Sequence, residues 1–315
     1  MQNLLLVCFL IIIIVFIVRD PHLTENFNSK SVKYDILTNN DKKVSYTDIL
    51  ANPDVKPTTS LSELSDSTKL KVAIVSMMRR PKDIDEWLEY HRAMGIIRFY
   101  IRLEDSEDLE EYLRGQKDIT LEIGKSTGKD EYKEIQIRQC TMVDAALKKA
   151  EEDNINWLLH IDCDELLEGD LDEFHKLSDK VRTIVMNNKE AVYKDIPREK
   201  DMCFSAVKFR DCTDSSSGCV SYVNGKSGGR AVYDVKCFGP HRFTSNRVDA
   251  EEKTLDMKIL HFESCDFNTY KQKFKHVAKD PKSDIPFPYY NDSVAAARKD
   301  DDKSLEDVFR RYRVA

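Results

Sequence analysis

The hydrophobic positions along the chain change from one long apolar run to short strand-like and helical patterns. Residues 4–18 are apolar without a break, and the run is somewhat shorter than the roughly twenty residues that a membrane-spanning helix prefers. No Lys or Arg precedes it and no small-residue cleavage site follows it, so residues 1–18 predict an uncleaved signal anchor rather than a signal peptide. Arg19, Lys30 and Lys33 follow the run, and by the positive-inside rule they argue against a lumenal body.

Residues 19–69 are rich in polar residues and show little apolar periodicity, which predicts a stem or linker. The folded body is expected at residues 70–280, and residues 281–315 predict a charged C-terminal helical tail. With the transmembrane segment, this organisation predicts a single-pass type II protein of the Golgi or another endomembrane, attached to the membrane by its N-terminal helix.

The first half of the body alternates short apolar runs with helical patterns. Strand-like runs cover residues 69–78, 96–105, 119–124 and 156–162, and helical patterns cover residues 83–95, 106–114 and 132–152. In the first helix, Trp87 and Tyr90 fall on the face expected to be buried. The alternation predicts an α/β fold with a mostly parallel, Rossmann-like sheet flanked by helices, in which ligands bind at the carboxyl ends of the strands.

After residue 168 the pattern changes to short β-like runs separated by Gly, Pro and Asp turns, which predicts appended antiparallel strands that wall the site. These runs cover residues 206–209, 219–223, 230–235 and 257–262. A helical pattern follows at residues 267–279, and the charged residues 298–313 predict a solvated surface helix.

The charged residues are abundant but mixed in sign, with 49 Lys and Arg against 56 Asp and Glu and a net charge of −7. This balance gives no reason to expect nucleic acid as a partner. The eight cysteines include no Cys-x-x-Cys pair, which argues against a structural zinc site. Cys212 and Cys219 bracket a polar loop that a disulfide could close in an oxidising compartment, and reduced thiols fit the sequence equally well.

Two acids stand directly at the end of the apolar run WLLHI, namely Asp162 and Asp164. Carboxylates so close raise each other's pKa unless a positive group lies between them. Mn²⁺ or Mg²⁺ prefers oxygen ligands and keeps coordination positions for a diphosphate. A solvated Asp-x-Asp loop explains the pair as well, but such a loop seldom follows directly on a buried strand.

Four segments of the body carry, in order, the motifs of a known enzyme group: EWLEYHRAMGIIRFYI, WLLHIDCDELL, NGKSGGRAVYDVKCFGPHRF and ILHFESCDFNTYKQKF. They resemble GT-A fold glycosyltransferases of family 2, especially the branch related to family 92. The resemblance covers residues 71–279. It implies a metal-dependent, inverting glycosyltransferase that moves a sugar from a nucleotide-sugar donor to a hydroxyl of a glycan or glycoconjugate.

The resemblance also implies roles for individual residues. Asp162 and Asp164 hold the metal and the donor diphosphate, and His261 completes the metal ligands. Glu165 orients the donor sugar, while Lys226 in the Gly-rich NGKSGG meets the diphosphate, where the glycines let backbone amides approach phosphate oxygens. His261 is equally explained as a core histidine, and Lys226 as a solvated residue of a hairpin turn.

The sequence departs from that group around the expected nucleotide pocket. An Asn-Glu pair is usual after the first strand, and Arg79 and Arg80 stand there instead. These two either contact the diphosphate or are ordinary surface charges. We include Arg79 and Asp105 among the cofactor-binding residues, with His241 on the acceptor side.

An inverting transfer also needs a carboxylate that takes the proton from the acceptor hydroxyl. Asp211, Glu263 and Asp234 are the candidates for this role, because all three follow the metal motif at predicted strand ends. Asp211 is favoured, because the resemblance implies that the matching region borders the acceptor cleft. All three equally fit ordinary surface acids.

Two other functions stay open at this point. Because the Asn-Glu pair is missing, the alternative is a catalytically inactive nucleotide-sugar or glycan-binding scaffold of the same fold. A metal-dependent phosphoryl-transfer enzyme is the third reading of the same acidic motif.

Overall fold

The structure is a computed structural model that describes residues 70–125, 132–198, 201, 203–213, 219–279, 281, 285 and 287–315. All of these belong to one compact unit, Tyr34–Ala315. The predicted anchor at residues 1–18 and the predicted linker at residues 19–69 lie outside the described residues.

Within the described part of the chain, no helix is both long and apolar enough to cross a membrane. The prediction of a transmembrane signal anchor is corrected to this extent: the described residues contain no membrane-spanning helix. They therefore give no support to a membrane partner or to a type II endomembrane location, which both rested on residues 1–18.

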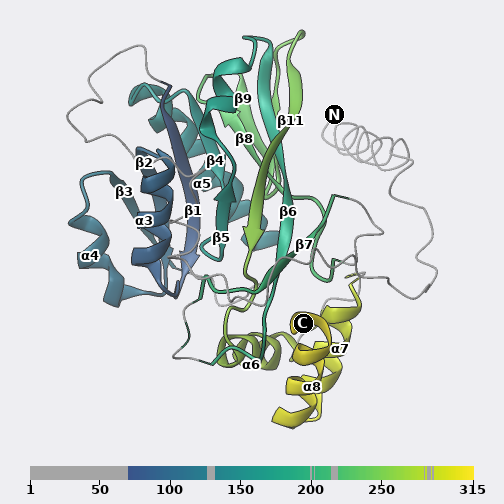
Figure 1. The fold of residues 1–315 in the computed structure, drawn as a ribbon. Coiled ribbons are helices and arrows are strands. Elements are labelled where there is room, and N and C mark those ends of the chain that lie inside the picture. Colours follow the sequence, from purple (N-terminus) through teal and green to yellow (C-terminus); the bar gives the residue numbers. More distant parts are fainter. Residues whose placement is uncertain are drawn as a thin grey trace, which may run out of the picture. The chain divides into compact units, whose positions relative to one another are not determined.

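Figure 1 shows the described body as a central sheet with helices around it. The strands are β1 (Val72–Arg79), β2 (Arg98–Glu104), β3 (Ile119–Gly124), β4 (Trp157–His160), β5 (Glu165–Glu168), β6 (Val181–Val192), β7 (Lys208–Asp211), β8 (Lys226–Arg230), β9 (Val235–Gly239), β10 (Arg242–Ser245) and β11 (Glu251–His261). The α-helices are α3 (Ile84–Met94), α4 (Glu110–Arg114), α5 (Tyr132–Glu152), α6 (Phe267–Val277), α7 (Pro288–Arg298) and α8 (Asp302–Arg313), with 3₁₀ turns η3 (Glu107–Leu109) and η4 (Leu171–Lys176).

The main sheet has the strand order β3-β2-β1-β4-β8-β6-β11-β5, with β7 paired to β6, while β9 and β10 form a separate pair. The four strands β3, β2, β1 and β4 run parallel. β8 runs antiparallel to β4 and β6, and β11 runs parallel to β6 and antiparallel to β5. The predicted α/β fold, with parallel strands and appended antiparallel ones, is confirmed at this level.

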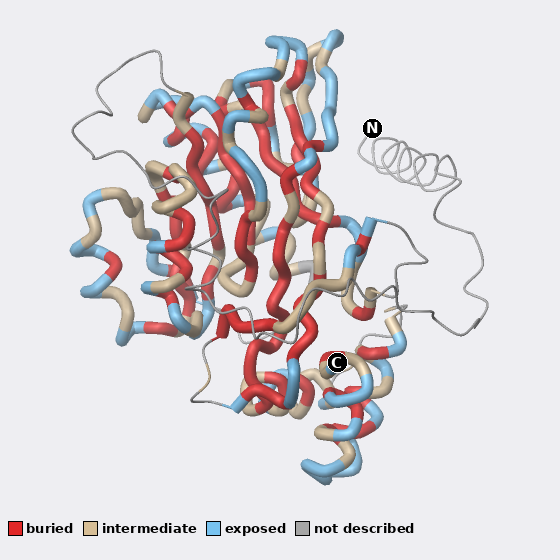
Figure 2. Tube along the Cα trace, in the orientation of Figure 1, coloured by how far each residue is buried: buried red, intermediate tan, exposed pale blue. Residues whose placement is uncertain are grey.

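The alternation of side chains along β1 shows that helices cover both faces of the sheet. Ile74 and Met78 belong to the same buried cluster as Trp87 of α3, whereas Val75 belongs to the cluster that holds Val143 of α5. Because successive residues of a strand point to opposite faces, α3 and α5 pack on opposite sides. Both faces of β1 are accordingly buried (Figure 2). A ligand is therefore expected to bind at the ends of the strands and not on a face of the sheet.

The second half of the body differs from the sequence prediction in several strands. The Gly-rich segment, for which a hairpin turn was the alternative explanation, is strand β8, between β4 and β6. Of the strand predicted at residues 230–235, only the first residue lies in β8 and the last in β9. A Cβ atom at Gly228 would lie 2.5 Å from Leu159 Cδ2, so the glycines let the strands approach closely. The 12-residue β6 was not predicted, because polar residues interrupt its apolar pattern, and the predicted strand at residues 219–223 lies outside every described strand.

The C-terminal tail is helical as predicted, but α8 is not simply solvated. It buries Leu305, Val308 and Phe309 together with the charged Arg313. The backbone of Val314 pairs with Tyr193, directly after β6. The end of the chain is therefore part of the packed body.

Two disulfides are formed among the described cysteines. One joins Cys212 to Cys219, which resolves the alternative left open by the sequence. The other joins Cys203 to Cys265 across 62 residues, and nothing in the sequence indicated that pairing.

Candidate functional site

The candidate site lies where the ends of four strands meet. Because β8 runs antiparallel to β4, its first residue, Lys226, lies beside the carboxyl end of β4, from which Asp162 and Asp164 follow. The last residue of β11, His261, pairs with Glu165, the first residue of β5. The sheet thus brings together five residues that the sequence separates by up to 99 positions.

Lys226 is the positive group between the acids, and we call Asp162, Asp164 and Glu165 with Lys226 the acid cluster. The Lys226 ammonium forms a short hydrogen-bonded ion pair with Asp162 Oδ2 and lies 3.5 Å from Glu165 Oε2. Its side chain is 1% exposed, which corrects the reading of Lys226 as a solvated turn residue. Burial alone lowers the pKa of a lysine, but the Asp162 and Glu165 carboxylates raise the pKa of Lys226 above its ordinary value.

Asp162 stays ionised because of the same contact. Desolvation acts to raise the pKa of its carboxyl, but the Lys226 ammonium holds that pKa well below its usual range. The Asp162 side chain keeps 32% of its surface exposed. A carboxylate paired with lysine on one oxygen still has a second oxygen for a ligand.

Glu165 binds the backbone just after β4. Its Oε2 accepts a hydrogen bond from the Asp162 amide at 2.7 Å, and its Oε1 accepts one from the hydroxyl of Tyr222. Burial is the main reason that the pKa of Glu165 rises to about 8. Because Glu165 is fully buried and binds groups of the protein itself, the described geometry favours a supporting role over the predicted contact with a donor sugar.

Asp164 and His261 face each other across the site. Asp164 Oδ2 lies 3.8 Å from His261 Nε2, and the two side chains are 37% and 7% exposed. Burial, followed by the nearby Asp162, raises the pKa of Asp164 to about 6, whereas burial lowers the pKa of His261 to about 3. His261 is therefore a neutral imidazole, the form that binds metal ions.

The three candidate bases lie in different places. Glu263 is the one beside the acid cluster, where its Oε1 accepts a hydrogen bond from Lys273 Nζ at 2.6 Å. Burial opposes ionisation, but Lys273 on α6 lowers the pKa of Glu263 to about 2. The Glu263 carboxylate is thus kept charged, and its charge contributes to raising the pKa of Asp164.

Asp211 and Asp234 make their described contacts away from the acid cluster. Asp211 is exposed at the end of the edge strand β7, and its Oδ1 accepts a hydrogen bond from the Thr213 amide. Asp234 is buried beside Arg182 at the start of β6, the opposite end of that strand from the site, and accepts a hydrogen bond from Ser245. The preference for Asp211 is therefore not supported by its position, and Asp234 has a structural partner.

The predicted nucleotide-side residues lie at the carboxyl ends of β1, which neighbours β4, and of β2, the next strand beyond β1. Arg79 ends β1, and Asp105 follows β2. Arg80 and Asp105 have left-handed backbone φ values of 51° and 48°, and Ser264, just after β11, has 51°. Non-glycine residues in this region gather at functional sites, so the strand ends on both sides of the acid cluster share this feature.

His241 also reaches the site. Its Nδ1 lies 2.8 Å from the carbonyl oxygen of Gly225, and burial lowers its pKa to about 4. Trp87 and Tyr90 pack as the helix spacing predicted. Their side chains donate hydrogen bonds to the Glu165 and Leu167 carbonyls at 2.8 and 2.5 Å, so α3 is fixed against β5.

The sequence reasoning missed Tyr222, whose ring lies between those of His241 and His261, at centroid distances of 5.0 and 4.9 Å. It also missed Lys273, the partner of Glu263. Lys273 lies on the predicted helix at residues 267–279, but only the folded chain brings it to Glu263. No local pattern pointed to either residue.

Comparison with known proteins adds little to this geometry. No family model and no curated protein matches the chain. Among solved structures, the chain is similar to the crystal structure of HddC from Yersinia pseudotuberculosis complexed with GMP-PN, at 12% identity and a TM-score of 0.30, over 65% of this chain and 100% of that one. A likeness this weak carries no argument about fold or function.

Proposed function

We propose that the chain is a metal-dependent glycosyltransferase of the GT-A type. It transfers a sugar from a nucleotide-sugar donor to a hydroxyl of a glycan or glycoconjugate, with inversion. The observation that carries the proposal is the acid cluster at the carboxyl end of β4, with the neutral His261 opposite Asp164. Carboxyl ends of strands in such sheets are where ligands bind.

The composition of the acid cluster fits a divalent cation. Asp162 and Asp164 supply two carboxyl groups against the single ammonium of Lys226, and Glu165, whose pKa is raised to about 8, adds a third charge only when it ionises. Burial, and after it the nearby Asp162, raise the pKa of Asp164 to about 6. Two carboxylates and a neutral imidazole are ligands that suit Mn²⁺, and also Mg²⁺ with water in the remaining positions.

In this proposal Asp162, Asp164 and His261 hold the cation. Among the described residues, these three are not a group whose ligand atoms all lie within 4.8 Å of one another, so their side chains would move closer together to bind it. When bound, it acts as a Lewis acid that stabilises charge on the leaving diphosphate. Lys226 fixes the position of Asp162, and Glu165 fixes the backbone of the Asp162–Glu165 turn. Arg79 and Asp105, at the neighbouring strand ends, are proposed to face the nucleotide.

Glu263 is the proposed general base. Lys273 keeps its carboxylate ionised but also lowers its basicity, so Lys273 must move away before the carboxylate accepts a proton. The Glu263 carboxylate contributes to the electrostatic surroundings of Asp164. A base in this position takes the proton from the acceptor hydroxyl as the new bond forms. Asp211 and Asp234 are not proposed for this role, because their described contacts lie away from the acid cluster.

One observation favours the inactive scaffold as a second candidate. Lys226 already neutralises part of the charge on Asp162, so a nucleotide-binding protein could keep this arrangement without any metal. The two candidates differ in whether bound nucleotide sugar is cleaved.

The test is a nucleotide-release screen with the purified full chain, a panel of nucleotide sugars and Mn²⁺. We expect Asp164→Asn to lower manganese-dependent release by about a hundredfold or more, because it removes charge at the reacting diphosphate. The matched control is Asp179→Asn, whose side chain is 100% exposed, and it should leave release unchanged.

Three results would count against the enzyme. Release that is independent of Mn²⁺ contradicts the role of the cation, and an unimpaired Asp164→Asn variant contradicts the role of the acid cluster. Nucleotide-sugar binding without release by the wild type supports the scaffold.

A further inference from the structure

Glu190 is a fully buried carboxylate outside the acid cluster. It lies near the end of β6, opposite His261 in the neighbouring strand β11 and opposite Arg210 in β7. A buried carboxylate is costly unless charges and hydrogen bonds compensate it. Arg210 Nη1 at 3.3 Å and Arg313 Nη1 at 3.9 Å supply the opposite charge.

The oxygens of Glu190 hold a segment that belongs to no strand or helix. The backbone amides of Val220 and Ser221 donate to Glu190 at 2.8 and 2.7 Å, and the hydroxyl of Ser221 donates to the same carboxylate. Asn188, two residues before Glu190 and so on the same face of β6, donates from Nδ2 to the Tyr222 carbonyl at 2.8 Å. The backbone of residues 220–222 is thus hydrogen-bonded by side chains of β6, and not by the backbone of a neighbouring strand.

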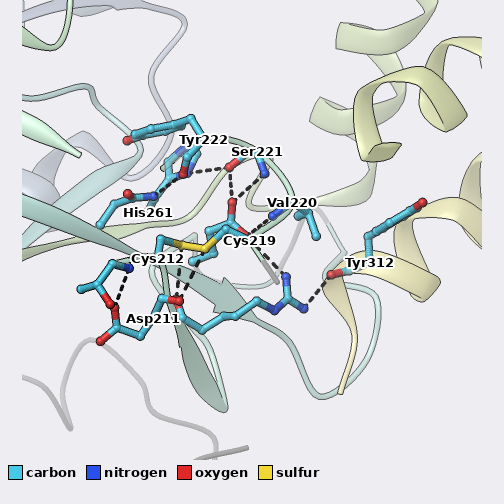
Figure 3. The surroundings of a disulfide bond; sticks show 12 residues. Asp211, Cys212, Cys219, Val220, Ser221, Tyr222, His261 and Tyr312 are labelled. Carbon is cyan, nitrogen blue, oxygen red and sulfur yellow. Dashed lines mark hydrogen bonds and ion pairs between the residues drawn. A yellow bond between two sulfur atoms is a disulfide. The ribbon is translucent and has the colours of Figure 1, made fainter. Parts of the chain in front are cut away.

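A covalent bond fixes the start of the same segment. Cys219, directly before Val220, is joined to Cys212 just after β7. Figure 3 shows that Ser221 and Tyr222 then lie beside His261. Ser221 Oγ is 3.4 Å from His261 Nδ1, on the other side of the imidazole from the Nε2 that faces Asp164.

We propose that Glu190 is a positioning residue of the site. By binding the Val220 and Ser221 amides, it holds the Tyr222 hydroxyl on Glu165 and the Tyr222 ring against His261. It does not touch the reacting groups itself. Its effect on turnover rests on the proposed function, whereas its effect on the position of Tyr222 does not.

The test compares Glu190→Gln with Glu252→Gln. Glu252 lies near the start of β11, at the opposite end of that strand from His261, and forms an exposed ion pair with Arg242 of β10. Amide hydrogen exchange is measured by mass spectrometry on the full chain, together with acetylation of Tyr222 by N-acetylimidazole. A glutamine directs its NH₂ group at one of the two amides, so exchange at residues 219–222 should become about tenfold faster or more. Tyr222 should become reactive, and Glu252→Gln should change neither.

A merely structural role would give a different pattern, with faster exchange throughout β6 and β11. That pattern overturns the proposal, and so does unchanged protection at residues 219–222. If Glu190→Gln does not fold, Ser221→Ala removes one of the three donors and leaves both arginine pairs. It should raise Val220 exchange and Tyr222 reactivity in the same direction by less, and no change at either overturns the proposal.

Nucleotide release measured on the same variants separates the two claims. If the wild type releases no nucleotide, the proposed function fails, while the exchange and acetylation results still decide the position of Tyr222. If the wild type is active, Glu190→Gln should lower release without loosening the rest of the sheet.

Discussion

At the scale of single residues, the charge balance of the site depends on Lys226. The acids at the end of β4 repel one another, and a lysine from an antiparallel neighbour reduces that repulsion. Asp164 receives less of this compensation, and the pKa of its carboxyl is raised to about 6. Lys226 therefore neutralises part of the charge of the acid cluster, and a cation beside Asp164 belongs to the proposed function.

Replacing Lys226 by methionine tests this balance. Lys226→Met keeps most of the side-chain volume and leaves Asp162 and Glu165 without their cation, which should destabilise the fold by about 3 kcal/mol at pH 7. We expect the lower end of the usual range, because Asp162 keeps 32% of its side chain exposed. Without the ammonium, the folded-state pKa of Asp162 rises above its unfolded value, and the pKa of Glu165, already raised to about 8, rises further. The loss therefore appears as pH rises and Asp162 ionises, and it shrinks as pH falls toward 4.

The measurement is urea unfolding of both proteins between pH 4 and 7. Lys149→Met is the control, because Lys149 lies in an exposed ion pair with Glu152 and such pairs contribute little. An equal effect of the two substitutions at pH 7 would contradict the role assigned to Lys226.

At the scale of elements, the sequence predicted the strands and helices whose signal is local. β1, β2, β3 and β4 appear as apolar runs, and α3 and α5 as amphipathic periods, so the parallel half of the fold followed from pattern alone. β8 carries the opposite local signal, since glycines usually mark turns. Its strand character arises from neighbours far away in sequence, and for the same reason the burial of Lys226 could not be predicted.

The close packing of β8 gives a prediction for its glycines. In Gly228→Ala the new Cβ would lie 2.5 Å from Leu159 Cδ2 and 2.9 Å from the Leu158 carbonyl oxygen. The backbone atom cannot rotate away, so overpacking should cost about 1–3 kcal/mol of stability. Thermal and urea unfolding measure the loss.

The control for Gly228→Ala is the same substitution at Gly115, the C-cap of α4. There the new Cβ would meet the Tyr112 carbonyl oxygen at 3.4 Å, an ordinary contact. Gly115→Ala should be neutral or slightly stabilising, because alanine restricts the unfolded chain. If Gly228→Ala is as mild, β8 does not pack as the structure shows.

At the scale of the whole molecule, long-range links converge on the segment that carries the proposed base. Arg313 at the end of α8 donates to the Glu263 carbonyl at 3.1 Å. Cys265, two residues further along, is bonded to Cys203, whose amide donates to Asp83 at 2.6 Å. The C-terminus and the loop after β1 are thus both tied to this segment, an arrangement with no signature in any short stretch of sequence.

The two disulfides should differ in how much they stabilise the fold, because a cross-link mainly restricts the unfolded chain and does so more for a longer loop. Removing Cys203–Cys265, with a separation of 62 residues, should cost about 4 kcal/mol on this basis, and removing Cys212–Cys219, with a separation of 7, about 2 kcal/mol. Urea unfolding of the two double-alanine variants measures both values. An equal loss, or the reverse order, would show that local packing around the Cys212–Cys219 bond, including the Glu190 contacts that follow it, contributes more than loop closure does.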